Sequence, residues 1–255
     1  MRLKLNGLMA AAVGLCLSGV AEAALQGRDL DGNLATAEAY YDTALNITWL
    51  ADANYAGVKM EAGMANGWAA NLSIADSVNN ITYSDWRLPT AKPLNGIGYV
   101  VDYGNVSYVE GGQDAGYNIS APGSTYAGSI ASEMAFMFYN TLGNSADFSL
   151  AGDYTGCNFS DSDTCLNNVG PFSNLQHDAY WTGSIFTGYG YGSDRWWLFD
   201  MREGSQNQIE RYDNRFAWAV SDGDIGLATS VPEASTWAMM LAGLGLIGIA
   251  ARRRT

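Results

Sequence analysis

One histidine, His177, is the only side chain of the sequence whose ordinary pKa suits it to general base catalysis near neutral pH. A Ser-His-Asp site needs this imidazole close to a nucleophile and to an orienting carboxylate. Asp178 follows His177 in the sequence, but adjacency along the chain does not place its carboxylate on the imidazole. A single histidine also disfavours a His-based metal site. We therefore expect an exposed histidine and no enzymatic activity.

Carboxylates are the second group that could do chemistry, because the chain has 26 Asp and Glu residues. Their separation in space, which decides whether a pair forms a glycosidase site, does not follow from the sequence. Calcium is the stronger alternative, because it binds several oxygen ligands on flexible loops. Three short acidic segments fit this chemistry: Asp29 to Asn33, Asp161 with Asp163, and Asp222 with Asp224. None completes a twelve-residue calcium loop, so we expect no cofactor, with a structural calcium at Asp161 and Asp163 as the alternative.

Two cysteines of the body, Cys157 and Cys165, flank the polar segment NFSDSDT. An exported chain meets an oxidising environment, in which such a pair forms a disulfide. Closing this short loop is worth about 2–3 kcal/mol by the chain-entropy relation. A zinc site is the alternative, but it requires a second thiol pair or histidines nearby.

Trp196 and Trp197 are adjacent in RWWLFDM (195–201), a segment typical of a β-strand. Neighbouring residues of a strand point to opposite faces, so we expect one of the two rings to be exposed. An exposed tryptophan can stack on a sugar ring, and we predict a ligand platform here. Tyr189 and Tyr191 of the preceding loop are predicted to supplement it.

These residues need a scaffold, and the sequence predicts one domain. Two β-favouring runs in residues 37–52 indicate a hairpin. A helix follows, with Met60, Met64, Trp68 and Leu72 facing inward and Ala65 and Ala69 beside them. A second helix is expected over 129–144, with Ser132 or Ser129 as its cap and Gly143 as its stop. Short strands are predicted at 179–186, 195–201 and 215–220, with a hairpin loop at 203–208. This order favours an α+β fold with helices flanking an antiparallel sheet.

The N-terminus has the features of a secretory signal peptide. Arg2 and Lys4 precede an apolar stretch, and Ala21, Glu22 and Ala23 form an A-x-A cleavage site. We predict that residues 1–23 are removed after export by the Sec machinery, with an uncleaved anchor as the alternative.

The C-terminal segment 231–255 resembles a PEP-CTERM sorting signal, the substrate mark of an exosortase. Pro232 and Glu233 carry the motif, and Ala234 stands where a second proline is usual. The apolar run 237–251 is shorter than the roughly 20 residues of a comfortable membrane span. Arg252, Arg253 and Arg254 follow it and are expected to keep the C-terminus in the cytoplasm. The resemblance implies transient anchoring in the inner membrane, then delivery to the cell envelope or the exterior.

The body is strongly acidic, with 8 Lys or Arg and 24 Asp or Glu in residues 24–231. Such a surface repels nucleic acid and anionic polysaccharide unless a local basic patch overrides it. Arg195, Arg202, Arg211 and Arg215 are the candidates for a patch, but acidic residues are interleaved with them. We therefore expect no nucleic-acid partner.

Several motifs of the body resemble, in order, the Lcl C-terminal-domain family. They are YYDTALNITWLADANYA (40–56), YSDWRLPTA (83–91), SEMAFMFYNTLGN (132–144), GPFSNLQ (170–176), YWTGS (180–184) and FAWAV (216–220). The resemblance covers about residues 38–222 and implies a C-type-lectin-like fold, with a twisted antiparallel sheet, two main helices and long loops. It also implies binding of sulfated polysaccharide, which the acidic surface of this body disfavours because a polyanion is bound by exposed Arg and Lys.

Taken together, these features predict a signal peptide (1–23), a single domain (24–230) and a sorting signal with a short transmembrane helix (231–255). The predicted function is non-catalytic, a polysaccharide-binding or adhesive module associated with exopolysaccharide. A purely structural matrix protein is the main alternative. A more distant one is an enzyme like the formylglycine-generating enzymes, which the RLPT segment (87–90) resembles and which need a reactive cysteine pair. The oligomeric state stays open.

Overall fold

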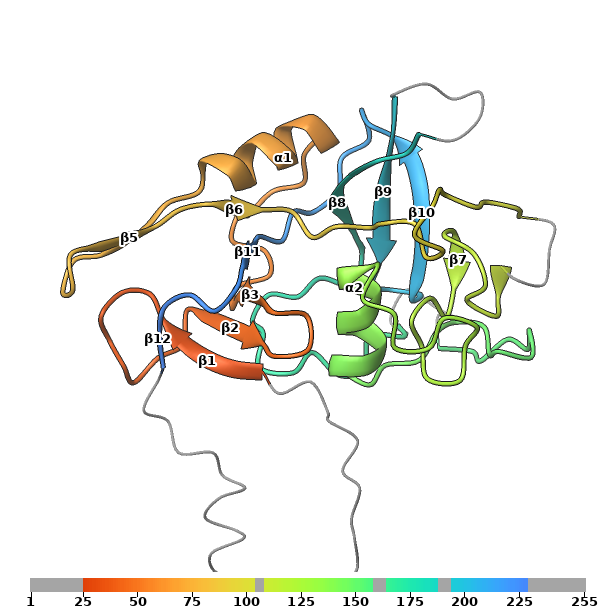
Figure 1. The fold of residues 1–255 in the computed structure, drawn as a ribbon, viewed down its shortest axis with the longest axis horizontal. Helices are drawn as coiled ribbons and strands as arrows, with labels where there is room; N and C mark the ends of the chain where they lie inside the picture. Colours follow the sequence, from red (N-terminus) through yellow and green to blue (C-terminus); the bar gives the residue numbers. More distant parts are fainter. Residues whose placement is uncertain (1–24, 104–107, 158–163, 188–193, 229–255) are drawn as a thin grey trace, which may run out of the picture.

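A computed structural model describes residues 25–103, 108–157, 164–187 and 194–228. Strands contain 30% of the described residues and helices 11%, so the described part of the protein is mostly β. The predicted α+β, C-type-lectin-like class with two main helices is therefore wrong. The cause lies in the two segments expected to be helical, which form only short helices packed against antiparallel sheets (Figure 1).

The larger sheet contains six strands and brings the first and last described strands together. In spatial order these are β12 (Leu227–Ala228), β1 (Leu25–Asp29), β2 (Ala39–Asp42), β3 (Ile47–Leu50), β11 (Val220–Asp222) and β6 (Trp86–Arg87). All of its pairings are antiparallel. β1 thus lies between β12 and β2, at the lower left in Figure 1.

The second sheet has four antiparallel strands, three from the C-terminal half and one from the long central loop region. They are, in spatial order, β7 (Gly116–Tyr117), β10 (Ser205–Glu210), β9 (Arg195–Asp200) and β8 (Ala179–Ile185). β8 and β9 agree with the predicted strands. The predicted loop 203–208 is wrong, because β10 begins at Ser205. A separate hairpin consists of β4 (Ile74–Asp76) and β5 (Ile81–Tyr83).

The hairpin predicted for residues 37–52 is confirmed as β2 and β3. Its turn is held by Asp42, whose Oδ1 accepts the N–H groups of Ala44 and Leu45 at 2.9 and 3.0 Å. Asn46 ends the turn with a φ of 53°, a left-handed conformation that asparagine tolerates better than most residues.

The first helix is α1 (Ala62–Asn71), and its predicted inward face is wrong only for Met64. Met60, just before the helix, is buried, and Trp68 and Leu72 pack against the core. The buried residues of α1 are Ala62, Ala65 and Ala69, whereas Met64 is 64% exposed. The three alanines form a flat face at helical spacing, and their small side chains let α1 lie close to β6 and β8. The long side chain of Met64 is therefore placed on the solvent side.

The second helical segment is α2 (Glu133–Phe136), which continues as the π-helical turn η2 (Met137–Thr141). It is shorter than the predicted 129–144. Ser132 caps it as expected, because its Oγ accepts the N–H of Ala135 at 3.3 Å. Gly143 follows with a φ of 69°, which matches the predicted stop.

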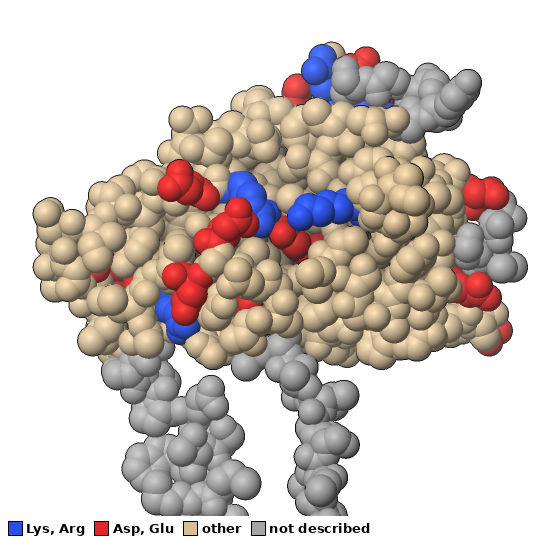
Figure 2. Space-filling model, in the orientation of Figure 1, with Lys and Arg blue, Asp and Glu red and all other residues tan. Residues whose placement is uncertain are grey.

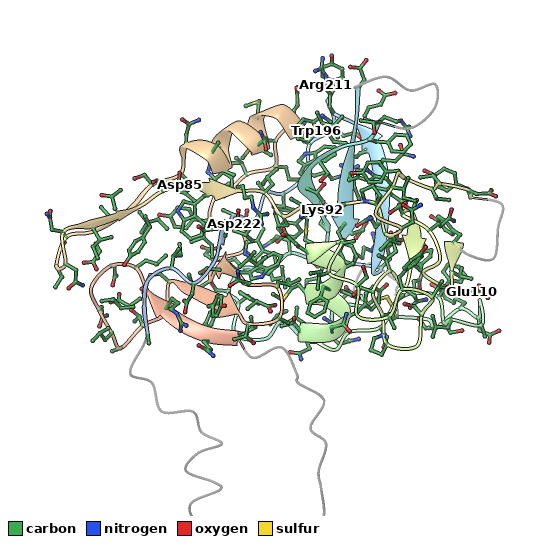
Figure 3. The ribbon with its side chains drawn as sticks, in the orientation of Figure 1. Asp85, Lys92, Glu110, Trp196, Arg211 and Asp222 are labelled. Atoms are coloured by element: carbon green, nitrogen blue, oxygen red, sulfur yellow. A yellow bond between two sulfur atoms is a disulfide. The ribbon has the colours of Figure 1, made fainter. Side chains whose placement is uncertain are left out.

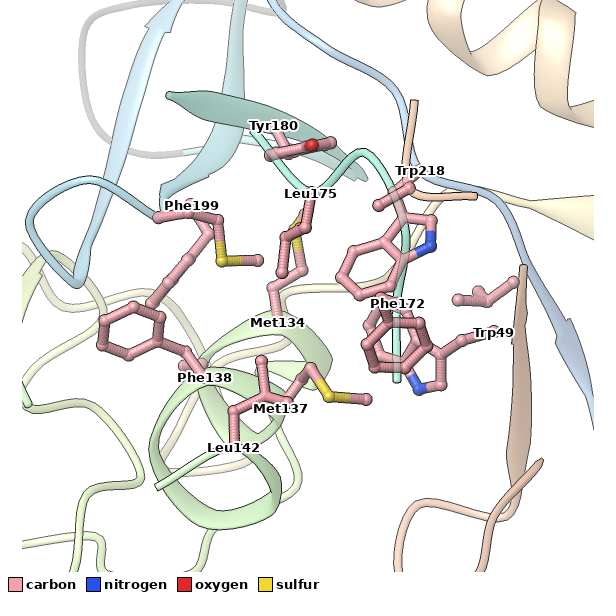
Figure 4. Close-up of a cluster of buried hydrophobic side chains, with 14 of the residues drawn as sticks. Trp49, Met134, Met137, Phe138, Leu142, Phe172, Leu175, Tyr180, Phe199 and Trp218 are labelled. Carbon is pink, nitrogen blue, oxygen red and sulfur yellow. The ribbon is translucent and has the colours of Figure 1, made fainter. Parts of the chain in front are cut away.

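The main core lies between α2, η2 and the two sheets (Figure 4). Trp49 and Trp218 pack with ring centroids 4.5 Å apart, and Phe172 meets Trp218 at 4.8 Å. The indole N–H of Trp218 donates to the backbone carbonyl of Leu50 at 2.8 Å. Most tryptophans of the described residues belong to the core, since Trp49, Trp86, Trp181, Trp197 and Trp218 are all buried.

Candidate functional site

Three carboxylates meet where β1 passes into β2. Asp29 is the last residue of β1, Asp31 lies in the connecting loop, and Glu38 directly precedes β2. One carboxylate oxygen from each lies within 4.8 Å of the others. The antiparallel pairing of Arg28 with Ala39 causes this, because it closes the loop and returns Glu38 to the side of Asp29.

Asp29 is fully buried, and its two oxygens differ in their surroundings. Oδ1 accepts three backbone N–H groups, from Asp31, Gly32 and Asn33, at 3.0, 2.8 and 3.0 Å. Oδ2 is also buried but has no hydrogen-bond partner among the described residues. A buried polar atom without a partner costs about 1–3 kcal/mol, and more when it is charged.

The carboxylates of Asp31 and Glu38 also accept hydrogen bonds from backbone N–H groups of this loop. Oδ1 of Asp31 accepts the N–H of Asn33 at 2.9 Å, and Oε2 of Glu38 accepts the N–H of Leu30 at 3.1 Å. Asp31 is exposed and Glu38 is half-buried. Each therefore keeps one oxygen that no hydrogen bond within the described residues occupies.

Gly32 brings the loop against the β4–β5 hairpin. Its φ is 91°, and a Cβ at this position would lie 2.4 Å from Cβ of Val78, so only glycine fits. Asp76 of this hairpin adds a further negative charge nearby, and hydrogen bonds from Asn79 lower its pKa. Burial, and then the charges of Asp76 and Asp29, raise the pKa of Tyr83. The loop therefore lies in a negative field.

A cavity of about 380 Å³ opens beside this cluster. Tyr55 stands at its edge and is 52% exposed. Asp52 lies next to it and is fixed by an N–H of Asn54, which donates to its Oδ1 at 2.9 Å. The complete lining consists of Asp31, Ala37, Glu38, Leu50, Ala51, Asp52, Tyr55, Ile74 and Ser173. The cavity is thus lined by an aromatic ring, several carboxylates and apolar side chains.

Of the two tryptophans predicted as a ligand platform, only Trp196 is partly exposed. Trp197 is fully buried, with its ring 4.9 Å from that of Tyr99 and 5.4 Å from that of Phe186, so it cannot hold a ligand. Trp196 is partly buried and lies near α1 (Figure 3). Its role as a platform stays a prediction. Tyr189 and Tyr191 lie outside the described residues.

The predicted disulfide is confirmed, since Cys157 and Cys165 are bonded with their Cα atoms 4.8 Å apart. Asp161 and Asp163, the predicted calcium ligands, lie outside the described residues. The carboxylate of Asp178 forms an ion pair with Lys59 at 2.5 Å, and His177 is exposed.

Two of the four arginines considered as a basic patch are paired with acidic neighbours. Arg211 lies 3.7 Å from Asp194, and Arg215 lies 3.6 Å from Asp213. On the face shown in Figure 2, basic and acidic side chains are interleaved and large areas carry no charge. This distribution offers no extended positive surface for a polyanion on that face.

The chain matches one family model, the PEP-CTERM protein-sorting motif, over residues 230–254. This match includes Pro232, Glu233, Arg252, Arg253 and Arg254, all outside the described residues. The protein is thus exported across the inner membrane to the cell envelope or the exterior, as a substrate of exosortase. No curated protein and no solved structure matches the chain, so the resemblance of its body to the Lcl C-terminal-domain family has no support. Within the described residues, no helix is long and apolar enough to cross a membrane.

Glu38, Asp52 and Tyr55 were not predicted as site residues. Glu38 does not belong to any sequence motif that marks a site. Its position beside Asp29 depends on the register of β1 and β2. Asp52 and Tyr55 belong to a motif of the body, but Ile74 and Ser173, which complete the cavity, come from distant parts of the sequence.

Proposed function

We propose that this exported protein is a non-catalytic glycan-binding module whose site is the cavity beside the β1–β2 loop. The observation that carries the proposal is the exposed ring of Tyr55 next to the carboxylate of Asp52. Tyrosine joins an apolar face to a polar hydroxyl, which suits it to the equally amphipathic surface of a sugar ring. Carboxylate oxygens accept hydrogen bonds from sugar hydroxyls.

The size and composition of the cavity support a small ligand or one segment of a polymer. Its volume of about 380 Å³ falls within the ordinary range of ligand sites. Leu50, Ala51 and Ile74 provide apolar contacts, whereas the carboxylates provide directed hydrogen bonds.

The charge of the protein favours a neutral saccharide. The whole chain has a formal net charge of −13, and the cavity wall includes Asp31, Glu38 and Asp52. A sulfated or uronic acid polymer would bring like charges together at short range, which is unfavourable. The same carboxylates are acceptors for hydroxyl groups of uncharged sugars.

A binding experiment with the full chain in detergent tests this function. Neutral and sulfated polysaccharides are titrated against the wild type, Tyr55→Ala and Asp52→Asn, and affinity is followed by calorimetry. We expect binding of a neutral polymer, weakened about 3–10-fold by Tyr55→Ala because the stacking contact is lost. Tyr212→Ala is the matched control, since Tyr212 is 57% exposed but lies on Arg211, away from the cavity lining.

Two outcomes would contradict the proposal. Loss of binding in Trp196→Ala together with full binding in Tyr55→Ala would move the site to β9. Absence of binding to every polymer would favour a purely structural matrix protein.

A further inference from the structure

We infer that Asp29, Asp31 and Glu38 bind a calcium ion at the loop that joins β1 to β2. The three residues offer carboxylate oxygens within 4.8 Å of one another, close enough to be bridged by one ion. Calcium prefers carboxylate and carbonyl oxygens and accepts irregular geometry. With the ion bound, Asp52 is the carboxylate of the cavity lining that stays free for sugar hydroxyls, so the cation site does not depend on saccharide binding.

The buried Oδ2 of Asp29 is the observation that points to a ligand. Asp29 is 0% exposed, and this oxygen has no hydrogen-bond partner among the described residues. Its companion Oδ1 is already saturated by three backbone N–H groups, which hold the carboxylate in one orientation. A cation at Oδ2 would compensate the cost of burying it.

The charge of the cluster is also uncompensated. Within the described residues, no Lys or Arg forms an ion pair with Asp29, Asp31 or Glu38. The adjacent Arg28 is directed elsewhere, since its guanidinium is paired with Asp224 at 2.5 and 2.8 Å. Three carboxylates so close together repel one another unless a cation neutralises them.

An ion can reach this position from solvent. Asp31 and Glu38 line the cavity, and Asp31 is exposed. The remaining coordination positions are open to water, as is usual for calcium sites with few protein ligands. Magnesium fits less well, because it requires octahedral geometry at shorter distances and gives up its water reluctantly.

The expected consequence is stabilisation of the loop by calcium. Extracellular calcium modules bind with Kd values of about 0.1–1 mM. At 10 mM calcium chloride the Tm of the full chain in detergent should therefore rise by about 3–10 °C. The same titration followed by calorimetry should give saturable binding of about one ion per chain, without any saccharide present.

Isosteric variants identify the ligands. Asp31→Asn and Glu38→Gln keep the oxygens that accept the N–H groups of Asn33 and Leu30 but remove a charge, so both should fold and lose most of the calcium response. Asp29→Asn should abolish it, because the amide nitrogen replaces Oδ2. Glu110→Gln is the control, since it removes the charge of an exposed Glu at the opposite end of the molecule (Figure 3). It should respond like the wild type.

A wild type whose Tm does not change up to 10 mM calcium would overturn the inference. So would an Asp31→Asn variant with an unchanged calcium response, or an equal Tm shift with magnesium chloride. Loss of glycan binding alone, with the calcium shift intact, would affect only the proposed function.

Discussion

The guanidinium of Arg87 holds the carboxylate of Glu133 in a bidentate pair, with N–O distances of 2.8 and 2.9 Å. This pair joins β6 to the first turn of α2. Oε2 of Glu133 also accepts the N–H of Thr90 at 2.7 Å, so the carboxylate fixes the backbone after β6 as well. Arg87 has a second acidic partner in Asp222 of β11, at 2.6 Å. The two carboxylates differ greatly in exposure, at 10% for Glu133 and 79% for Asp222.

Arg87→Ala should lower the free energy of unfolding by about 2–3 kcal/mol. Removing one partner of a buried pair leaves the other charge unpaired and typically costs about 3–5 kcal/mol. The 28% exposure of the Arg87 side chain reduces this value. Urea unfolding at pH 7, followed by tryptophan fluorescence, measures the change.

Asp222→Ala is the control for this pair, because its carboxylate is largely in solvent. Exposed ion pairs contribute about 0–1 kcal/mol, so we expect a small effect. If Arg87→Ala and Asp222→Ala lower the free energy of unfolding equally, the pair with Glu133 contributes no more to stability than the exposed pair with Asp222.

Asp200 should make stability depend on pH between about 4 and 6. Burial, and then the charge of Glu203, raise its pKa to about 6, whereas an unfolded Asp has a pKa of about 3.9. Below pH 3.9 the group is protonated in both states and its contribution is fully present. As the pH rises to 6 and above, the folded state must bury a charge, and about 2–3 kcal/mol of stability is lost.

Asp200→Asn tests this dependence, because Asn keeps the Oδ1 that accepts the N–H of Arg202 at 2.8 Å. The difference in stability between variant and wild type should increase from pH 4 to pH 7 in favour of the variant. Urea unfolding at unit pH steps measures it, with Glu110→Gln as a control of equal charge change. A difference that is independent of pH would contradict the raised pKa.

Sequence patterns correctly predicted the features that depend on interactions between residues close together in the sequence. The β2–β3 hairpin follows from β-favouring runs around the Asp42 turn, and the disulfide from two cysteines eight residues apart. Ser132 was one of two predicted caps, with Ser129, and its side chain needs only the next turn of the chain to act as one.

The errors arose where the structure depends on contacts between segments that are far apart in the sequence. The spacing of Met60, Met64 and Trp68 predicted one inward face, but Met64 is exposed because the close approach of the helix to the sheet places the small alanines at the contact. At the site, Asp29 and Asp31 were recognised as an acidic segment. The third carboxylate, Glu38, joins them only through the pairing of β1 with β2.

Removal of the tail should depend on Pro232 and Glu233, which lie in the matched sorting motif. We expect the apolar run after them and the three arginines that follow to hold the chain in the inner membrane until exosortase acts. We expect the wild-type protein of the envelope to lack residues 1–23 and the C-terminal arginines by intact mass. Glu233→Ala should instead remain in the inner-membrane fraction with Arg252 to Arg254 retained, while Glu110→Gln is processed normally. Equal processing of Glu233→Ala and wild type would refute the role of the motif, because the apolar run is the same in both.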